Sequence, residues 1–324
     1  MKLAFIVDPL EKLDPSGDTS VAMIEAALQA GHDPFVVTGG ELSLVDGRAR
    51  APLRRITLMD GRMDGVRWIA PSDWHRLDAA PTGPIALDDM DAVFLRTDPP
   101  LDRRYLWATW ILDAVDPART ILVNDPGGIR DANEKLFSLR FRDLVPPTLI
   151  SADREQIRAF LDVHGCVVLK PIDGHAGRGV LRLTGGDPNV SSMVELATAR
   201  GRQPVVIQAW VHGAERGNHR ILLWDGEVLG AVNRPVEPDD FRTGSPAEAI
   251  ELSDRERHIV ARLAPELRRR GLRFVGLDTI GDWLIEVNVT SAGGIRQAIG
   301  LGFPTIARDL IDAVELEARR RAVS

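Results

Sequence analysis

Short apolar runs recur through the first third of the chain. Four of them are typical of buried strands, because they are rich in Val, Ile, Leu and Phe and are bounded by polar or turn residues: LAFIVD (3–8), PFVVTG (34–39), DAVFLR (91–96) and ILVN (121–124). Between the first two runs, Asp18 is placed to cap a helix that continues through Ala30 and ends at Gly31. A helix rich in Trp and Leu should follow the third run and reach Ala114. This alternation predicts an open α/β domain over residues 1–125.

Residues 41 to 90 interrupt the alternation. Short β-like pieces, RITLM (55–59) and WIA (68–70), are separated there by Gly, Pro and Asp, so we expect irregular structure with short strands. Elsewhere in an open α/β sheet, ligands meet the carboxyl ends of the strands. Arg96, Asp98 and Asn124 lie at such ends. They are either ligand-binding residues or caps of strands and turns, and the pattern favours neither interpretation.

The pattern changes after residue 130. DANEKLFSLRFRDLVPPT (131–148) predicts an amphipathic helix that two prolines end, and ADREQIRAFLDVHG (152–165) predicts a second helix. A strand, CVVLKPIDG (166–174), a glycine-rich loop and a strand, GVLRLTGG (179–186), complete an α+β module. PVVIQAWV (204–211) begins a third module, in which HRILLWDGEVLGAVNR (219–234) forms a strand pair around an Asp-Gly turn. LDTIGDWLIEVNVTS (277–291) and a C-terminal helix end the chain.

Composition narrows the class of protein. The 324 residues are 44% hydrophobic and 27% charged, which is enough material for two or three packed units. A net charge of −7 argues against a nucleic-acid partner, although a local basic pocket for a phosphate is compatible with it. No stretch is long enough to span a membrane, and the start of the chain does not resemble a signal peptide. With a single cysteine, Cys166, these features predict a cytoplasmic protein without a membrane partner.

Three polar residues interrupt the apolar strand pair near the C-terminus. Glu286 and Asn288 are two apart and face the same side of a strand, while Asp278 lies on the preceding strand across a Gly-Asp turn. Carboxylate and amide oxygens that converge in this way suit Mg²⁺ bound together with a substrate phosphate. The alternative is a solvated sheet edge, but residues 275–277 and 284–289 are otherwise too apolar for one.

A second candidate for phosphate binding is the glycine-rich loop. Lys170 ends a strand and is followed by Gly174, Gly177 and Gly179. Glycines allow backbone N–H groups to approach a polyanion closely, and the lysine adds a point charge. A flexible turn would look the same, and the loop matches neither the P-loop nor a dinucleotide fingerprint. Combined with the magnesium trio, it predicts ATP and metal-assisted phosphoryl transfer.

Several of these segments together carry a family resemblance. NEKLFS (133–138), VVLKPIDG (167–174) and RFVGLDTIGDWLIEVNVTS (273–291) followed by Ile295-Arg296, together with IVDP (6–9) and LRTDPP (95–100), resemble bacterial glutathione synthetases of the ATP-grasp superfamily. The similarity covers nearly the whole chain in order. It implies an open α/β, preATP-grasp domain on the substrate side (1–125). A two-lobed ATP-grasp fold follows, with a central lobe that carries the lid loop (126–204) and a C-terminal lobe that carries the magnesium site (205–324).

The resemblance also assigns roles to single residues. ATP binding is implied for Lys135, Lys170, Gly174, Gly177, Gly179, Asn218 and the interlobe segment Gln208, Ala209, Trp210 and Val211. Asp278, Glu286 and Asn288 would bind two Mg²⁺ ions, or Mn²⁺ in their place. Three arginines would lie near the triphosphate and the reacting carboxylate: Arg220, Arg234 and Arg242. Substrate contacts are implied for Asp18, Arg96, Asp98, Ser291 and Arg296.

The implied activity is ATP-dependent ligation of a carboxylate to an amine through an acyl phosphate, with release of ADP and phosphate. Its partners would be a small-molecule acid and amine, γ-glutamylcysteine and glycine in this family, and the protein would be a homo-oligomer. The chain departs from the family pattern at Thr97, Ala292, Gly293 and Gln297, and in a shorter, acidic segment after Arg234. A ligase for a different acid and amine therefore stays open, as does a non-catalytic ATP-binding protein.

Overall fold

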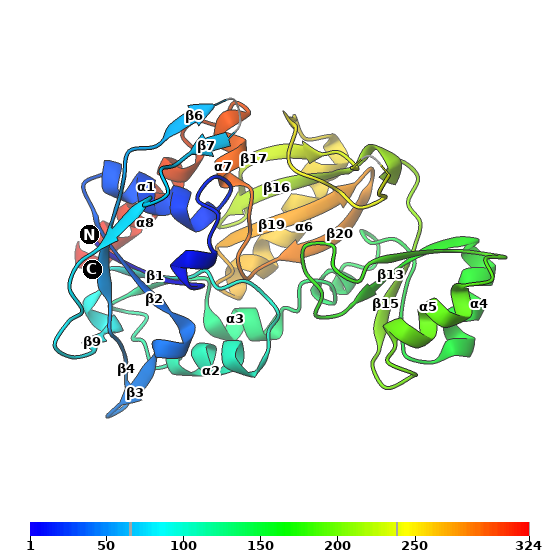
Figure 1. Cartoon of the computed structure of the whole chain (residues 1–324), viewed down its shortest axis with the longest axis horizontal. Coiled ribbons are helices and arrows are strands. Elements are labelled where there is room, and N and C mark those ends of the chain that lie inside the picture. The colour runs from blue at the N-terminus through cyan, green and yellow to red at the C-terminus, as the bar shows by residue number, and fades with distance from the viewer. Residues whose placement is uncertain (65–66, 238, 324) are drawn as a thin grey trace.

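The computed structural model describes residues 1–64, 67–237 and 239–323, which form three sheet-based units in chain order (Figure 1). The N-terminal unit contains a six-stranded sheet in the order β11-β10-β1-β2-β5-β8. Its strands are β1 (Lys2–Val7), β2 (Asp33–Thr38), β5 (Arg54–Leu58), β8 (His75–Leu77), β10 (Ala92–Leu95) and β11 (Ile121–Val123). The first four in spatial order are parallel, and β5 and β8 add antiparallel pairings, which confirms the open α/β prediction.

Helices and small sheets complete this unit. The helices are α1 (Thr19–Gln29), α2 (Arg103–Leu112) and α3 (Pro126–Asp131). Asp18 caps α1 as expected, because its Oδ1 accepts the N–H of Val21 at 2.9 Å. The irregular stretch forms two small sheets, made of β3 (Ser43–Val45), β4 (Arg48–Ala51) and β9 (Ile85–Ala86), and of β6 (Arg62–Asp64) and β7 (Arg67–Ile69).

The central unit is an antiparallel four-stranded sheet in the order β12-β15-β13-β14. Its elements are β12 (Thr148–Ser151), α4 (Arg154–His164), β13 (Cys166–Pro171), β14 (Leu181–Thr184), α5 (Val190–Ala197) and β15 (Val205–Ala209). Apolar residues of α4 and α5, such as Ile157 and Val194, pack on the sheet in one small core. The sequence assigned β15 to the third module, but its pairing with β12 and β13 places it in this sheet.

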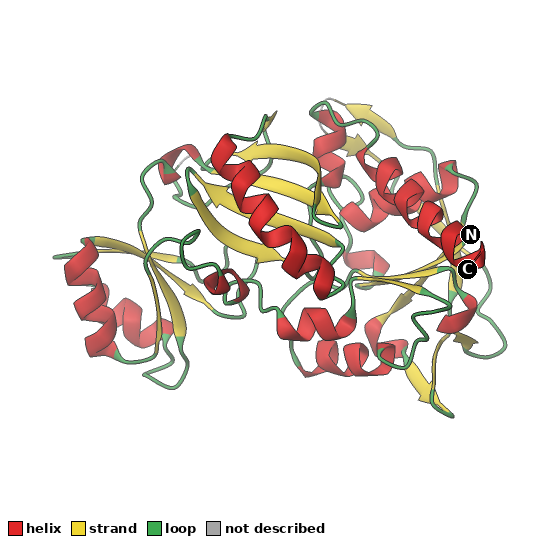
Figure 2. Ribbon diagram, turned by 180° about the vertical axis from the view of Figure 1, so that it is seen from behind, coloured by secondary structure: helices red, strands yellow, loops and turns green. Residues whose placement is uncertain are grey.

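The C-terminal unit is an antiparallel five-stranded sheet in the order β18-β17-β16-β19-β20, with one long helix across a face (Figure 2). Its elements are β16 (Asn218–Trp224), β17 (Glu227–Arg234), β18 (Glu248–Ala249), α6 (Asp254–Arg269), β19 (Phe274–Ile280), β20 (Trp283–Asn288) and α7 (Ile295–Gly300). The predicted turns are confirmed at Asp225-Gly226 and Gly281-Asp282, where the chain reverses between paired strands. Glycine suits both, since Gly226 and Gly281 have φ of +78° and +54°.

The last helix, α8 (Ile306–Val323), packs mainly against α1 of the N-terminal unit and also contacts β17 of the C-terminal sheet (Figure 1). Its apolar residues Leu310 and Val314 share a core with Phe5 and Ile24. The chain therefore returns to its first domain, which residue patterns within α8 could not indicate. Among the described residues, no helix is long and apolar enough to cross a membrane.

The expected helix over 131–147 is wrong. This segment contains only a short 3-10 helix, η4 (Phe137–Arg140). The side chain of Asn133 accepts the N–H groups of Lys135 and Leu136 at 3.1 Å, and the carbonyl of Glu134 accepts the N–H of Val287 in β20. These bonds use the backbone groups that a helix would need. The other 3-10 helices are η1 (Leu10–Lys12), η2 (Gly39–Glu41), η3 (Leu87–Asp89) and η5 (Ala214–Arg216).

Candidate active site

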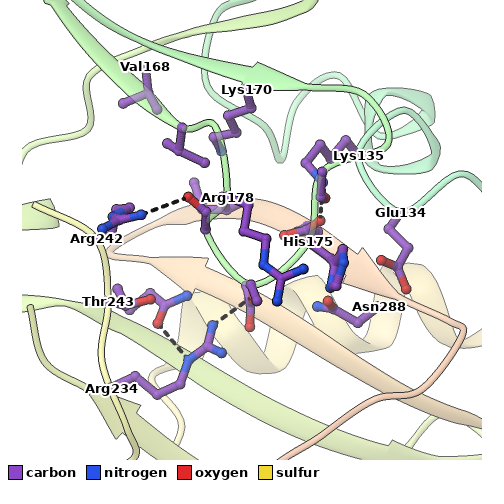
Figure 3. A pocket seen from close by; sticks show the side chains of 18 of the residues that line it. Glu134, Lys135, Val168, Lys170, His175, Arg178, Arg234, Arg242, Thr243 and Asn288 are labelled. Carbon is purple, nitrogen blue, oxygen red and sulfur yellow. Dashed lines mark hydrogen bonds and ion pairs between the residues drawn. The ribbon is translucent and has the colours of Figure 1, made fainter. Parts of the chain in front are cut away.

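A cavity of about 690 Å³ lies between the central and C-terminal sheets. Its walls come from β13, the glycine-rich loop, β15, the strands β16, β17, β19 and β20, and from Glu237 and residues 240–245 (Figure 3). Most of the sequence-selected residues line it: Lys135, Lys170, Gly174, Gly177, Gln208, Ala209, Trp210, Val211, Asn218, Arg220, Arg234, Arg242, Asp278, Glu286, Asn288, Asp98 and Ser291. Gly179, Asp18, Arg96 and Arg296 are not part of the lining.

Strands β19 and β20 bring the acidic residues together. Asp278 is the register partner of Glu286, and Asn288 is the partner of Gly276. The short turn at Gly281-Asp282 starts the pairing with Ile280 opposite Trp283, and a register shift between Asp278 and Thr279 then places Asp278 opposite Glu286, so that both carboxylates share one face. The predicted convergence of Asp278, Glu286 and Asn288 on one cavity is confirmed.

Asp278 is buried between two arginines. Its Oδ1 accepts Arg220 Nε at 2.6 Å, its Oδ2 accepts Arg220 Nη2 at 3.1 Å, and Arg234 Nη2 approaches Oδ2 at 2.8 Å. Burial alone would raise the pKa of Asp278, but the two guanidinium groups outweigh burial and lower this pKa to about 2. Asp278 is therefore a fixed negative charge that holds both arginines at the cavity wall.

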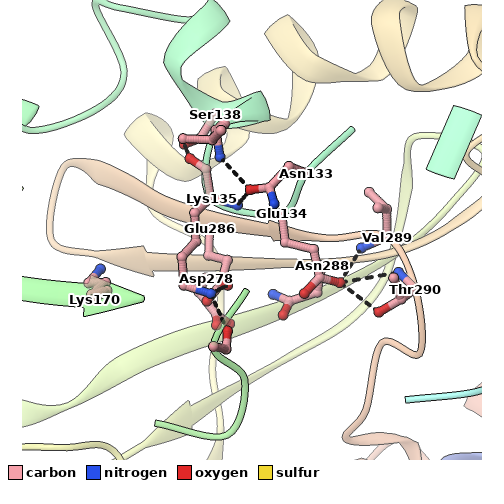
Figure 4. Close-up of polar contacts among 12 residues, drawn as sticks. Asn133, Glu134, Lys135, Ser138, Lys170, Asp278, Glu286, Asn288, Val289 and Thr290 are labelled. Atoms are coloured by element: carbon pink, nitrogen blue, oxygen red, sulfur yellow. Dashed lines mark hydrogen bonds and ion pairs between the residues drawn. The ribbon is translucent and has the colours of Figure 1, made fainter. Parts of the chain in front are cut away.

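Glu286 is paired with a lysine from the NEKLFS segment. Lys135 Nζ lies 2.9 Å from Glu286 Oε1 and also donates to the carbonyl of Gly174 in the glycine-rich loop (Figure 4). Lys170 Nζ donates to Gln208 Oε1 at 3.0 Å, and burial lowers the pKa of Lys170. Two lysines from different segments thus border the cavity beside the acidic strands.

Glu134 is a cavity residue that the sequence reasoning missed. It is buried, and its Oε1 accepts the N–H groups of Val289 and Thr290 at 3.1 and 3.2 Å and the hydroxyl of Thr290 at 2.8 Å (Figure 4). Burial, and then the nearby charge of Glu286, raise the pKa of Glu134. Its position directly before Lys135 was the available signal.

Asn124 holds the same segment from the other side. Its Nδ2 donates to the carbonyls of Val289 and Phe274 at 2.7 and 2.8 Å, and its Oδ1 accepts the N–H of Phe274 at 2.8 Å. Both peptide groups of Val289 are thus bound by buried side chains from outside β20. Of the two interpretations left open for Asn124, the structural one describes its contacts: it joins the first domain to β19 and to the end of β20.

The glycine-rich loop connects β13 and β14 over the cavity. Gly177 and Gly179 have φ of +68° and +71°, in the left-handed region that glycine adopts without strain. A Cβ on Gly179 would lie 2.9 Å from Pro171 Cγ, so this glycine shapes the loop although it does not line the cavity. Arg242 crosses from the opposite segment, with Nη1 3.3 Å from the carbonyl of Gly177, and is held by Asp240.

The interlobe segment that was expected to read a nucleotide base lies at the end of β15. The N–H groups of Ala209 and Trp210 donate to the carbonyls of Pro147 and Cys166 at 2.9 and 3.0 Å. Trp210 also packs under Arg182, whose guanidinium carbon lies 4.2 Å from the ring centroid. A nucleotide base would therefore have to bond to backbone groups of this segment other than these two N–H groups. Asn218 accepts Arg234 Nε at 3.0 Å, so it orients an arginine at the wall.

The residues expected to bind substrate separate into two groups. Asp98 and Ser291 line the cavity and are hydrogen-bonded to each other. Arg96 is buried and donates to Ser20 and to the carbonyl of Ala292, while Asp18 caps α1 and has a pKa raised by burial. Neither Arg96 nor Asp18 lines the cavity, so we describe both as structural residues behind its wall.

Arg296 departs further from expectation. It is 1% exposed, pairs with Glu25 of α1, and lies with its guanidinium carbon 4.5 Å from the centroid of the Trp68 ring. Its guanidinium is thus enclosed between α7 and the N-terminal unit and is not available to a ligand in this structure. The position of Arg296 after a site motif was a misleading signal, because the local sequence cannot show in which direction the arginine side chain points.

The oxygen donors of the acidic strands suit a hard divalent cation. Within the described ranges, no group of three or more His, Cys, Asp or Glu forms a complete metal cage. The trio instead offers two carboxylates and one amide, and Asn288 uses its Nδ2 on the carbonyl of Gly276. Such a partial set fits a cation that a phosphate-bearing ligand completes, since Mg²⁺ keeps few protein ligands.

Comparisons with known proteins agree with this arrangement. The model of the N-terminal domain of prokaryotic glutathione synthetase matches residues 1–130, and the model of its ATP-grasp domain matches residues 134–300. The glutathione synthetase of Nostoc sp. is 45% identical over 319 residues, which cover 97% of this chain and 98% of the relative. The glutathione synthetase of Bradyrhizobium diazoefficiens is 39% identical over 319 residues, with the same coverage.

Solved structures share the fold at low identity. The ATP-grasp ligase PsnB in complex with a minimal precursor, Mg and ADP superposes with a TM-score of 0.62 at 20% identity and covers 98% of both chains. D-cycloserine synthetase DcsG superposes with a TM-score of 0.63 at 17% identity and covers 97% of this chain and 100% of that one.

A cavity between two antiparallel lobes, lined by two lysines, a glycine-rich loop and an acidic strand pair, defines an ATP-grasp ligase. The protein is thus an enzyme, an ATP-dependent ligase of the acid–amino-acid type. More particularly, the chain belongs to the prokaryotic glutathione synthetase family.

Proposed function

We propose that this enzyme joins γ-glutamylcysteine to glycine, with ATP bound in the cavity between the lobes. One observation supports the proposal most strongly: the cavity combines the Asp278–Arg220–Arg234 cluster with the Glu286–Lys135 pair, so fixed cations and anions alternate where a charged phosphoryl group would move. Preorganised charges of this kind stabilise developing charge without reorganising at the moment of reaction.

The metal in this proposal is Mg²⁺, two ions with Mn²⁺ as a substitute, held by Asp278, Glu286 and Asn288. A divalent cation there would neutralise negative charge on the phosphates of the nucleotide. The arginines and Lys135, which now bond to Asp278 and Glu286, would be freed to bind phosphate oxygens. Lys170 and the backbone of the glycine-rich loop border the same space.

The reaction proceeds in two transfers. An oxygen of the acid carboxylate bonds to the γ-phosphorus of ATP, the bond from that phosphorus to the β–γ bridging oxygen breaks, and ADP leaves with the electron pair. The amine nitrogen then bonds to the acyl carbon, the bond from this carbon to the phosphate oxygen breaks, and phosphate leaves as the nitrogen loses a proton.

The chain's own residues serve these transfers by position and charge. Arg220, Arg234 and Arg242 lie along one wall, where they neutralise the oxygens of the transferred phosphoryl group. The glycine-rich loop and the segment that carries Arg242 touch across the cavity through the carbonyl of Gly177. This cover excludes water, which would otherwise hydrolyse the acyl phosphate.

The departures from the family pattern bear on the choice of substrate. Thr97, Ala292 and Gln297 lie outside the cavity lining, and Gly293 is within it. Most of the changes therefore fall at the contact between the first domain and residues 290–297, behind Asp98 and Ser291. This placement supports an active ligase with the family's substrate pair.

The test is product formation by purified protein with ATP and Mg²⁺. We expect one ADP per tripeptide when γ-glutamylcysteine and glycine are both present, and none when either is omitted. ADP release only with another acid and amine would overturn the substrate pair while keeping the ligase. Binding of ATP without turnover on any pair would overturn the ligase itself.

Two further expectations belong to the same proposal. Family resemblance supports a homo-oligomer, which sedimentation at several protein concentrations would test. The single cysteine supports action in a reducing compartment such as the cytoplasm, which cell fractionation would test.

A further inference from the structure

The cations that line the cavity differ in whether they have a partner. In the described part of the chain, five of the six lysines and arginines of the lining are bonded: Lys135 to Glu286, Lys170 to Gln208, Arg220 and Arg234 to Asp278, and Arg242 to Asp240. Arg178 is the sixth, and its side chain makes no hydrogen bond or ion pair there. It is exposed, whereas Arg220 is buried.

Arg178 sits at the turn of the glycine-rich loop. Its neighbours Gly177 and Gly179 both have positive φ, and its N–H donates to the carbonyl of His175 at 3.1 Å. The carbonyls of Gly174 and Gly177 are held by Lys135 and Arg242. The loop is therefore anchored on both sides, and Figure 3 shows the Arg178 side chain extending from it into the cavity, on the side of the strands that carry Arg234 and Asn288.

The missing partner has a consequence for anion binding. Arg220, Arg234 and Lys135 neutralise Asp278 and Glu286 before any ligand arrives, so their charges are already compensated. An incoming triphosphate must compete with these pairs, whereas Arg178 offers its full charge at once. A guanidinium also presents several N–H donors in a plane, which suits two oxygens of one phosphoryl group.

We propose that Arg178 is a catalytic residue that binds the γ-phosphoryl group of ATP and follows it to the acyl phosphate. The inference rests on the proposed function, because it takes the cavity to hold ATP. While the carboxylate oxygen bonds to the γ-phosphorus and the bond to the β–γ bridging oxygen breaks, negative charge stays on the three non-bridging oxygens. Arg178 donates hydrogen bonds to them throughout, and its proton is not transferred.

The test uses full-length protein with Arg178→Met, which keeps the length of the side chain and removes its charge. Arg158→Met is the matched control, because Arg158 is an exposed arginine on α4 of the same lobe, lies outside the cavity and has no partner among the described residues. Loss of one donor to a developing charge costs on the order of 10²-fold in kcat. We expect that loss in R178M, and a kcat within twofold of wild type in R158M.

Nucleotide affinity gives a second readout. R178M should bind a non-hydrolysable ATP analogue about tenfold more weakly, a loss of roughly 1.4 kcal/mol, and should bind ADP as wild type does, since ADP has no γ-phosphoryl group. Added guanidinium ion at millimolar concentration should restore part of the rate of R178A and leave R158A unchanged.

These outcomes separate the two proposals. A kcat for R178M equal to that of R158M, or an equal loss of affinity for ADP and the ATP analogue, would overturn the role of Arg178 while the ligase stands. If wild-type protein turns over no acid–amine pair, the proposed function fails, and the difference between ADP and the ATP analogue still decides whether Arg178 contacts the third phosphate.

Discussion

Replacing Asp278 with asparagine removes a charge while keeping the size of the side chain. In the wild type this carboxylate is 4% exposed and takes three short contacts from Arg220 and Arg234. Asparagine would leave two cations facing each other in a buried wall. Their remaining neutral partners would be the carbonyl of Gly293, for Arg220, and Asn218, for Arg234.

The cost follows from the geometry. Removing one partner of a buried ion pair destabilises a protein by about 3–5 kcal/mol, since the other charge stays buried without compensation. Unfolding entropy of about 2.1 cal/mol/K per residue gives roughly 0.7 kcal/mol/K for a chain of 324 residues, so Tm should fall by roughly 4–7 °C. The variant should also form no ADP, because Asp278 is a proposed metal ligand and orients two arginines.

Thermal unfolding followed by circular dichroism measures the shift. Asp282→Asn is the control, because Asp282 is an exposed residue of the turn between the same two strands, and it should change Tm by less than about 1 °C. Pyrophosphate should raise the Tm of D278N more than that of wild type, since it would bind the two released arginines. A D278N protein that melts within 1 °C of D282N would refute the reasoning about this cluster.

Three further substitutions test other contacts. Glu286→Gln removes the charge paired with Lys135 and should abolish ADP formation while Tm changes by only a few degrees, because the Glu286 side chain is 21% exposed; ADP release at the wild-type rate would contradict the metal assignment. Glu25→Gln should destabilise the protein more than the double change Glu25→Leu with Arg296→Met, because only the single change leaves the buried guanidinium of Arg296 unpaired. Melting temperatures in the opposite order would argue against the Glu25–Arg296 ion pair. Burial alone would raise the pKa of Glu256, but hydrogen bonds, the first from His219, lower this pKa from 4.5 to about 2. The stabilisation by the Glu256 carboxylate is therefore present above pH 4.5 and is lost as pH falls towards 2. Glu256→Gln should lose less stability than wild type in acid titrations, and parallel curves of stability against pH would argue against this contribution.

Local signals were sufficient for contacts between residues that are close in the sequence. The Gly281-Asp282 turn makes β19 and β20 neighbours, as the sequence indicated, whereas the pairing of Asp278 with Glu286 also requires a register shift between Asp278 and Thr279 that the regular strand period does not predict. The cap at Asp18 is likewise a contact within a few residues. The turn and the cap both join residues a few positions apart, so their physical cause is local.

Signals failed where the partner of a segment lies far along the chain. The segment that forms β15 was expected to begin the third module, because nothing within it indicates that it pairs with β12 and β13. The helix expected after Asp131 is replaced by bonds to β20, more than 150 residues away. For the same reason, Arg296 was expected at the site but is buried outside the cavity lining, whereas Glu134 was not expected there but lines the cavity. Burial and hydrogen-bond partners are properties of the assembled structure.

The most direct test of the ligase mechanism follows a single oxygen atom. γ-Glutamylcysteine labelled with oxygen-18 in its C-terminal carboxylate is incubated with the enzyme, glycine, ATP and Mg²⁺, and the products are analysed by mass spectrometry. Transfer through an acyl phosphate yields inorganic phosphate that carries one labelled oxygen per tripeptide, together with unlabelled ADP. Label in AMP, or unlabelled phosphate released alongside the tripeptide, would contradict it.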